Sequence, residues 1–239
     1  PLAVLSDKYR PLHHFFRQNF SQVTNPPIDS LRENKVMSLK TRFGNLGNIL
    51  NFKNLTKDNI YVLESPILSN SQFENFTNFF NQNSEIIDCS FSKDKSLIKA
   101  LKNIINQSEI AVRKGATQLI LSDITVSEDK IAIPMLLCVG AINKHLIKLN
   151  LRGYVSINVQ TGEALDTHSF ATLIGVGATT INPYLALDSI FQRYKKKLFG
   201  NYKYKECVER YIKSVNFGLL KIMSKMGISV LSSYRGGCN

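Results

Sequence analysis

The sequence predicts an α/β fold with a mostly parallel sheet and flanking helices. From residue 60 onward, short apolar runs typical of strands alternate with longer segments of helical periodicity. Residues 118–122 form an apolar run that is typical of a buried strand. Polar and turn-forming residues follow the expected strands, as they do at the carboxyl edge of α/β sheets. This alternation favours parallel strands joined by right-handed crossovers.

Residues 1–50 are expected to form an N-terminal helical arm. A proline in a first turn and apolar residues at helical spacing predict a helix over residues 11–21. Small polar residues that can cap a helix predict a second one over about residues 29–38. The glycine-spaced segment 42–48 is only a weak phosphate-binding signal, so it is interpreted as a plain turn.

A rigid polar turn is expected between these two helices, at Thr24, Asn25, Pro26 and Pro27. Each proline fixes its own backbone and biases the preceding residue away from helical geometry. The turn therefore has one of two roles. It is either a stiff connection, as loops between helices usually are, or it presents Thr24 and Asn25 to a passing molecule.

Residues 51–239 are expected to hold the βα units. The expected strands are residues 60–63, 86–89, 118–122, 154–159, 178–181 and 228–231. Ser69 or Asn70 is expected to cap a helix whose phenylalanines form a core-facing stripe. The other expected helices are residues 93–114, 134–149, 164–173, 184–197 and 206–225. Gly115 is placed to end the first of these.

Composition and charge restrict the classes of partner. The chain has 239 residues with 30 basic and 18 acidic side chains, a net charge of +12, but the lysines are scattered, so no nucleic-acid partner is expected. The cysteines are too widely spaced for a metal site, a redox motif or a disulfide framework. Reduced cysteines and the lack of a signal peptide or apolar span predict a cytoplasmic location and no membrane partner.

No self-contained active site is predicted in this sequence. There is no nucleophile elbow, and Gly175 and Gly177 lie in the wrong order for a dinucleotide loop. His168 is interpreted as structural, and no catalytic, cofactor-binding or metal-binding residues are assigned. The alternative is a free-standing α/β enzyme domain that binds a phosphate or nucleotide. It would use Asp123, Asn182 and the Gly236–Gly237 turn, which would have to meet in one pocket.

Both ends of the sequence have features of a cut chain. It begins at Pro1 without methionine, and it stops just after a glycine turn at Asn239. We therefore expect an excised piece of a longer polypeptide.

Several ordered runs resemble the central domain of the glutamate synthase large chain. They are PLAVLSDK (1–8), FSQVTNPPIDSLR (20–32), SLKTRFGNLGN (38–48), ILSD (120–123), IP (133–134), HSFA (168–171), GVGATTINPYLA (175–186), GLLKIMSKMGIS (218–229) and SSYRG (232–236). The resemblance covers essentially the whole chain, in order. The closing run, residues 233–239, is most similar to the bacterial NADPH-dependent type.

The resemblance implies a parent enzyme that makes L-glutamate from L-glutamine and 2-oxoglutarate. It implies an amidotransferase domain that releases ammonia, an FMN domain with a 3Fe-4S cluster, and a small (beta) subunit through which NADPH acts. The central domain itself would hold none of these cofactors. It would connect the two catalytic domains and line the ammonia tunnel, with Thr24 and Asn25 near the tunnel exit. Its fold would be an incomplete TIM-like (β/α) barrel.

The resemblance also implies contacts between the C-terminal end of this chain and the FMN domain. Residues 228–231 are expected to be the last strand, so the residues that follow would lie at a strand end. The residues expected to make these contacts are Ser232, Ser233, Tyr234, Arg235 and Gly236.

Overall fold

The computed structural model describes residues 10–17, 32–44, 50 and 60–236. The expected turn at Thr24 and Asn25 lies outside these residues. In the described part of the chain, the central element is a four-stranded parallel sheet in the order β3-β5-β7-β8. Its strands are β3 (Ser84–Asp88), β5 (Gln118–Ser122), β7 (Ser156–Gln160) and β8 (Thr180–Asn182). The predicted α/β fold is confirmed, and no closed barrel forms in the part of the chain that the structure describes.

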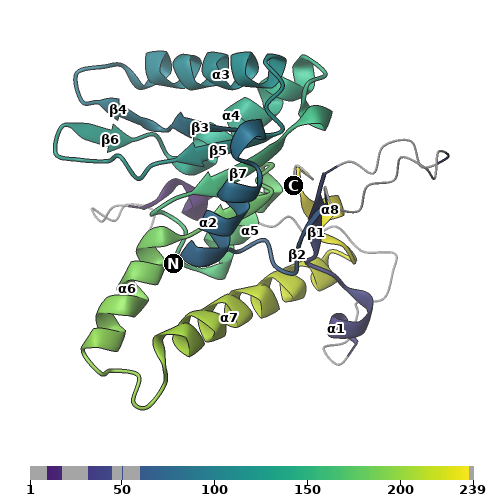
Figure 1. Cartoon of the computed structure of the whole chain (residues 1–239), viewed down its shortest axis with the longest axis vertical. Coiled ribbons are helices and arrows are strands. Elements are labelled where there is room, and N and C mark those ends of the chain that lie inside the picture. The colour runs from purple at the N-terminus through teal and green to yellow at the C-terminus, as the bar shows by residue number, and fades with distance from the viewer. Residues whose placement is uncertain (1–9, 18–31, 45–49, 51–59, 237–239) are drawn as a thin grey trace.

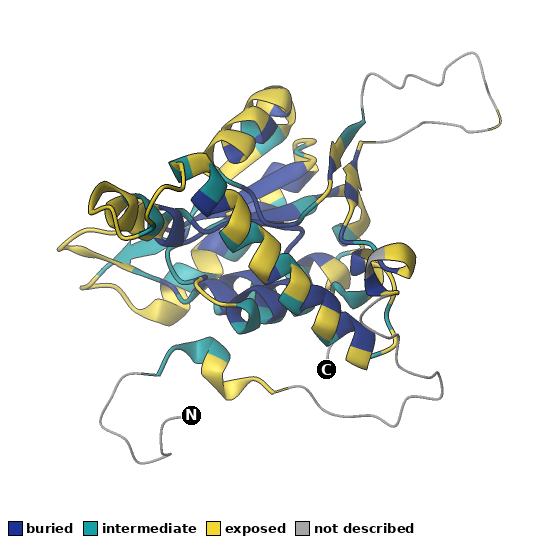
Figure 2. Ribbon diagram, turned by 90° about the horizontal axis from the view of Figure 1, so that it is seen from below, coloured by how far each residue is buried: buried dark blue, intermediate teal, exposed yellow. Residues whose placement is uncertain are grey.

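The crossover helices pack on one face of this sheet. They are α3 (Leu97–Arg113), α4 (Met135–Lys148) and α5 (Thr167–Gly175), and α7 (Tyr204–Lys225) packs against α5. Leu119 and Leu121 of β5 belong to the same apolar cluster as the buried sides of these helices. Figure 2 shows the middle of the sheet in dark blue and the outward helix faces in yellow. We call this covered side the outer face of the sheet.

The opposite, inner face is covered by α2 (Asn70–Phe79) and an antiparallel pair of strands, β1 (Thr41–Phe43) and β2 (Tyr61–Leu63). Ile120, which points the other way from its neighbours in β5, packs with Phe43, Phe76 and Phe80 in a separate cluster. The rings of Phe76 and Phe43 lie edge to face, with centroids 5.0 Å apart. This aromatic cluster therefore replaces the side chains that would fill the interior of a closed barrel.

Local sequence signals explain where the helices begin and end. Ser69 caps α2 because its hydroxyl oxygen accepts a hydrogen bond from the backbone N–H of Gln72, and the Gln72 side-chain oxygen accepts one from the backbone N–H of Ser69. Asp166 caps α5 through the backbone N–H of Ser169. Gly115 follows α3 with a φ of +100°, a conformation that glycine adopts without strain. These predicted boundaries are confirmed to within a few residues.

The sequence analysis did not predict the two antiparallel pairs of strands. The segment 60–63 is a strand, as expected, but it pairs with β1 from the N-terminal arm instead of joining the parallel sheet. A further pair, β4 (Ser90–Ser92) and β6 (Lys130–Ala132), extends from the strand ends. The three strands that were not predicted, β1, β4 and β6, are each three residues long, too short for a sequence period to identify. The arm thus contains a strand as well as helical turns.

The helical parts of the arm are shorter than predicted. The first is a single 3₁₀ turn, η1 (Leu12–Phe15), after which Phe16 is extended. None of its four residues is buried, and a short helix without a buried face has little to stabilise it. The second is α1 (Glu33–Val36), whose Glu33 is buried and contacts Lys221 of α7. Further short turns are η4 (Asn81–Asn83) and η5 (Arg152–Tyr154).

The predicted last strand, residues 228–231, is wrong. Only Val230 forms a bridge, to Ser38, and the chain then enters the short helix α8 (Leu231–Tyr234). The pairing with Ser38 stops at this one bridge, because the Ser38 carbonyl accepts from the N–H of Leu231, where the helix begins. The remaining helix, α6 (Tyr184–Lys195), follows β8 as predicted.

The aromatic cluster provides a test of this packing. Phe76 is fully buried, so Phe76→Ala is expected to lower the free energy of unfolding by about 3–5 kcal/mol, measured by chemical denaturation. Phe79→Ala is the matched control, because the Phe79 side chain is 47% exposed. An equal loss in the two variants would contradict the proposed cover of the inner face.

Candidate functional site

The strand-end residues named from the sequence lie at two opposite edges of the sheet. Asp123 and Asn182 lie at the carboxyl edge, directly after β5 and at the end of β8. Gly236 lies near the amino edge, where its N–H donates to the carbonyl of Ile174 in the last turn of α5. The two groups therefore do not meet in one pocket. This overturns the alternative of a phosphate- or nucleotide-binding site built from Asp123, Asn182 and the glycine turn.

Asp123 is the centre of a buried hydrogen-bond network at the carboxyl edge. Its side chain is 2% exposed and accepts hydrogen bonds from the Thr161 hydroxyl and from the backbone N–H of Gly162, at 3.1 Å to Oδ1. The nearby Tyr184 hydroxyl acts against burial by lowering the pKa of this carboxyl. A side chain at position 162 would place its Cβ 3.1 Å from the Tyr184 hydroxyl, so the close approach favours glycine there. Asp123 thus ties the loops after β5 and β7 to the start of α6.

Burial changes the titration of this network. Burial raises the pKa of the Asp123 carboxyl, against the lowering effect of its hydrogen bonds from Thr161 and Gly162. Burial and the nearby Asp123 raise the pKa of Tyr184 to about 12. Burial also raises the pKa of Glu163, whose carboxylate accepts a hydrogen bond from the N–H of Met135 at the start of α4. All of these groups are engaged by the protein itself, which suits a structural role better than catalysis.

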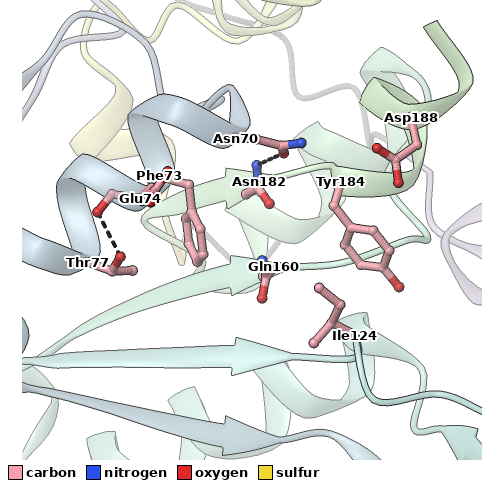
Figure 3. A pocket seen from close by; sticks show the side chains of 9 residues that line it. All are labelled: Asn70, Phe73, Glu74, Thr77, Ile124, Gln160, Asn182, Tyr184 and Asp188. Carbon is pink, nitrogen blue, oxygen red and sulfur yellow. Dashed lines mark hydrogen bonds between the residues drawn. The ribbon is translucent and has the colours of Figure 1, made fainter. Parts of the chain in front are cut away.

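A polar hollow lies beside this network, between α2 and α6 (Figure 3). It has a volume of about 340 Å³. Its lining residues are Asn70, Phe73, Glu74, Thr77, Ile124, Gln160, Asn182, Tyr184 and Asp188. Of these residues, the sequence analysis named only Asn182 as a candidate site residue. The signal it missed is the polar alternation in the strands, at Asn158 and Gln160 and at Thr180 and Asn182.

The C-terminal residues form a different environment. Ser232 and Ser233 are exposed on α8, and Tyr234 lies near Gly175, so none of them lies at a strand end as predicted. Burial and the nearby Arg152 lower the pKa of Arg235 to about 10. Among the described residues, the buried Nε of Arg235 has no hydrogen-bond partner.

Arg152, near the amino edge of the sheet, shows how the hydrogen-bonding groups of a buried guanidinium find partners within the domain. Its side chain donates to the side-chain oxygen of Asn143, to the carbonyl of Val155 and, at 3.0 Å, to the carbonyl of Gly177. Gly177 has a φ of +129°, and a Cβ there would lie 2.6 Å from the Asn143 side chain. Arg152 is thus fully engaged within the domain, in contrast to Arg235.

His168, Cys89 and Cys138 have structural environments. The Nε2 of His168 lies 2.8 Å from the backbone carbonyl of His13 and so holds η1 against α5. Cys89 and Cys138 are fully buried, and a hydrogen bond with Cys89, together with burial, raises the pKa of Cys138. In the part of the chain that the structure describes, no group of three or more His, Cys, Asp or Glu side chains is placed to bind a metal ion. Among the same residues, no helix is long and apolar enough to cross a membrane.

A family model described as the glutamate synthase central domain matches residues 1–239. The chain belongs to this family. It is 54% identical over its whole length to the NADPH glutamate synthase large chain of Azospirillum brasilense and 44% identical, over 99% of its length, to that of Bacillus subtilis. It is 43% identical to the chloroplastic ferredoxin-dependent glutamate synthase of Oryza sativa. The chain spans 16%, 15% and 16% of the length of these relatives.

Two solved structures match part of this chain, both at low sequence identity. One is a flavocytochrome b2 mutant with benzoylformate, with a TM-score of 0.44 and 13% sequence identity. The match covers 70% of this chain and 37% of the flavocytochrome chain. The other is the Eimeria tenella DHODH complex with ferulenol, with a TM-score of 0.42 and 16% sequence identity. The match covers 64% of this chain and 37% of the DHODH chain.

The buried acid gives a pH-dependent prediction. Because the pKa of Asp123 is raised in the folded state, the folded protein binds more protons than the unfolded chain just above the ordinary aspartate pKa of 3.8. The contribution of Asp123 to stability therefore falls as pH rises through this window. In Asp123→Asn this fall is absent, so the stability of the variant relative to the native protein should rise as the pH increases above the ordinary aspartate pKa.

Urea unfolding at a series of pH values measures this difference. The substitution also alters the hydrogen bonds to Thr161 and Gly162, and the free-energy cost of this does not depend on pH. It therefore shifts the plot of the stability difference against pH without changing its slope. Asp94→Asn is the control, because Asp94 is exposed. A difference that stays flat or falls with pH would show that Asp123 is not a desolvated acid.

Proposed function

We propose that this chain is the connecting domain of a glutamate synthase large chain. It would join a glutamine amidotransferase domain to an FMN domain and line the tunnel through which ammonia passes. The observation that supports this most is the family match over all 239 residues, in a chain that spans 16% of the length of the Azospirillum relative. The parent enzyme would make L-glutamate from L-glutamine and 2-oxoglutarate in the cytoplasm.

The internal chemistry of the domain supports a non-catalytic role. The carboxyl-edge residues, which are catalytic in many α/β folds, are engaged here in bonds to one another. The hollow beside them does not fit FMN, because among its described lining residues there are carboxylates but no basic side chain for a phosphate. We therefore infer that FMN and the 3Fe-4S cluster belong to other domains of the parent chain. NADPH would deliver electrons through a small (beta) subunit, as the 54% identity to an NADPH-type relative favours.

We infer that the C-terminal residues contact the FMN domain. The argument rests on Arg235, whose buried Nε lacks a hydrogen-bond partner among the described residues. A buried guanidinium without a partner is costly, and a carboxylate from a neighbouring domain would satisfy it. Ser232, Ser233, Tyr234 and Gly236 would then form the surrounding contact surface.

Thr24 and Asn25 remain the proposed residues of the tunnel wall. Replacement of Thr24 by leucine in the full-length enzyme should narrow the passage. The amidotransferase would then release ammonia to solvent, so more glutamine is hydrolysed for each glutamate formed. Parallel assays of glutaminase and synthase activity measure this ratio. Ser127→Leu, at an exposed loop position, is the control, and an unchanged ratio in Thr24→Leu would argue against the tunnel role.

The proposed contact of Arg235 is tested with Arg235→Met in the full-length protein. Loss of a charge-paired contact between domains should lower the temperature at which the flavin is released by several degrees. The measurement is flavin fluorescence during heating. Arg193→Met is the matched control, because Arg193 is exposed on α6. Identical release temperatures in the two variants would exclude the contact.

A further inference from the structure

The inner face of the sheet carries two rows of polar side chains, and one of them is complete. In the complete row, the Asn158 amide donates to Gln118 Oε1 at 3.0 Å and accepts from the Thr180 hydroxyl at 2.8 Å. Each of these three side chains is buried. This row shows how neighbouring strands of this sheet satisfy buried amides when no ligand is involved.

The second row, one step nearer the carboxyl edge, is interrupted. It consists of Ser122, Gln160 and Asn182, which are directly opposite one another in the register of β5, β7 and β8. Ser122 donates to Gln160 Oε1 at 2.8 Å, but no corresponding bond joins Gln160 to Asn182 in the described structure. Asn182 is 1% exposed, and its Oδ1 has no hydrogen-bond partner among the described residues.

The hydrogen bonds in the structure orient both amides. Asn182 Nδ2 donates to the carbonyl of Leu68, which only accepts, so Asn182 Oδ1 must point the other way. The Ser122 hydroxyl donates to Gln160 Oε1 and accepts from the N–H of Ile124. With its oxygen bonded to Ser122, Gln160 has its amide nitrogen on the side of Asn182. Figure 3 shows this nitrogen and the Asn182 oxygen on the sides of the two residues that face each other.

This pair presents one donor and one acceptor side by side at the base of the hollow. The group that complements it is a primary carboxamide, whose oxygen accepts from Gln160 while its N–H donates to Asn182. The rings of Phe73 and Tyr184 line the same hollow and suit a planar ligand. Glu74 and Asp188 also line it, and they disfavour a carboxylate ligand of the same shape.

We propose that this hollow is a binding site for a small planar primary carboxamide. Its volume of about 340 Å³ is much larger than the space of roughly 30 Å³ that a single water occupies. This proposal does not rest on the proposed ammonia tunnel, so either one can fail without the other. Its recognition chemistry is the Gln160–Asn182 pair, and its walls come from α2 and α6.

The test uses benzamide as the probe and benzoate as its matched analogue, which has the same shape but lacks the N–H donor. Ligand-observed NMR on the full-length protein is expected to show saturable binding of benzamide, with a Kd on the order of millimolar, and no binding of benzoate. Gln160→Glu keeps the side-chain length and the acceptor for Ser122 but replaces the donor. It should weaken benzamide binding at least about tenfold. Glu128→Gln, at an exposed position outside the hollow, should leave benzamide binding within about twofold, since it does not alter the site.

A second variant leaves the sheet unchanged. Thr77→Phe, on α2, fills the hollow from its outer side and should abolish benzamide binding while the protein stays folded. Equal binding of benzamide and benzoate would overturn the proposal. So would the absence of benzamide binding at its solubility limit, or benzamide binding that survives both Gln160→Glu and Thr77→Phe.

Discussion

The rest of the structure depends on covering both faces of an open parallel sheet. A parallel sheet is stable when apolar layers shield both of its faces, and in a closed barrel the interior is shielded by the strands themselves. Here the crossover helices cover the outer face, while α2 and the β1–β2 pair cover the inner one through the cluster around Phe76. Because β1 comes from the N-terminal arm, the arm is part of the core and not an appendage.

With both faces covered, the polar side chains at the carboxyl edge of the sheet form hydrogen bonds with one another's loops. In an α/β fold the groups after the strands are free to act on a ligand. In this domain Asp123 accepts from Thr161 and Gly162, and Glu163 accepts from Met135, so the carboxylates hold loops together. The exception is the gap between Gln160 and Asn182, where the row of inner-face amides is not completed. The carboxyl edge therefore combines loops held by their own hydrogen bonds with one pair of neighbouring amides that are not joined.

Sequence patterns predicted the elements with long or buried runs and failed on the short ones. Residues 118–122 match β5 to the residue, and the caps at Ser69 and Gly115 are where their chemistry placed them. The three-residue strands β1, β4 and β6 were not predicted, because the alternation of apolar and polar residues can be recognised only in a longer run. The expected strand over residues 228–231 became α8, because its only partner is a single residue, Ser38.

The sequence by itself determined the family, the α/β class and the absence of a known catalytic motif, because these follow from ordered runs and local periodicity. Only the tertiary structure decided which polar residues meet. Asp123 and Asn182 share an edge with Gln160 and Tyr184, while Arg235 and Gly236 lie at the opposite edge. The physical reason is that strand register and helix packing place residues from distant segments side by side. A hydrogen bond left unmade, as at Asn182 Oδ1, is visible only once all its neighbours are in position.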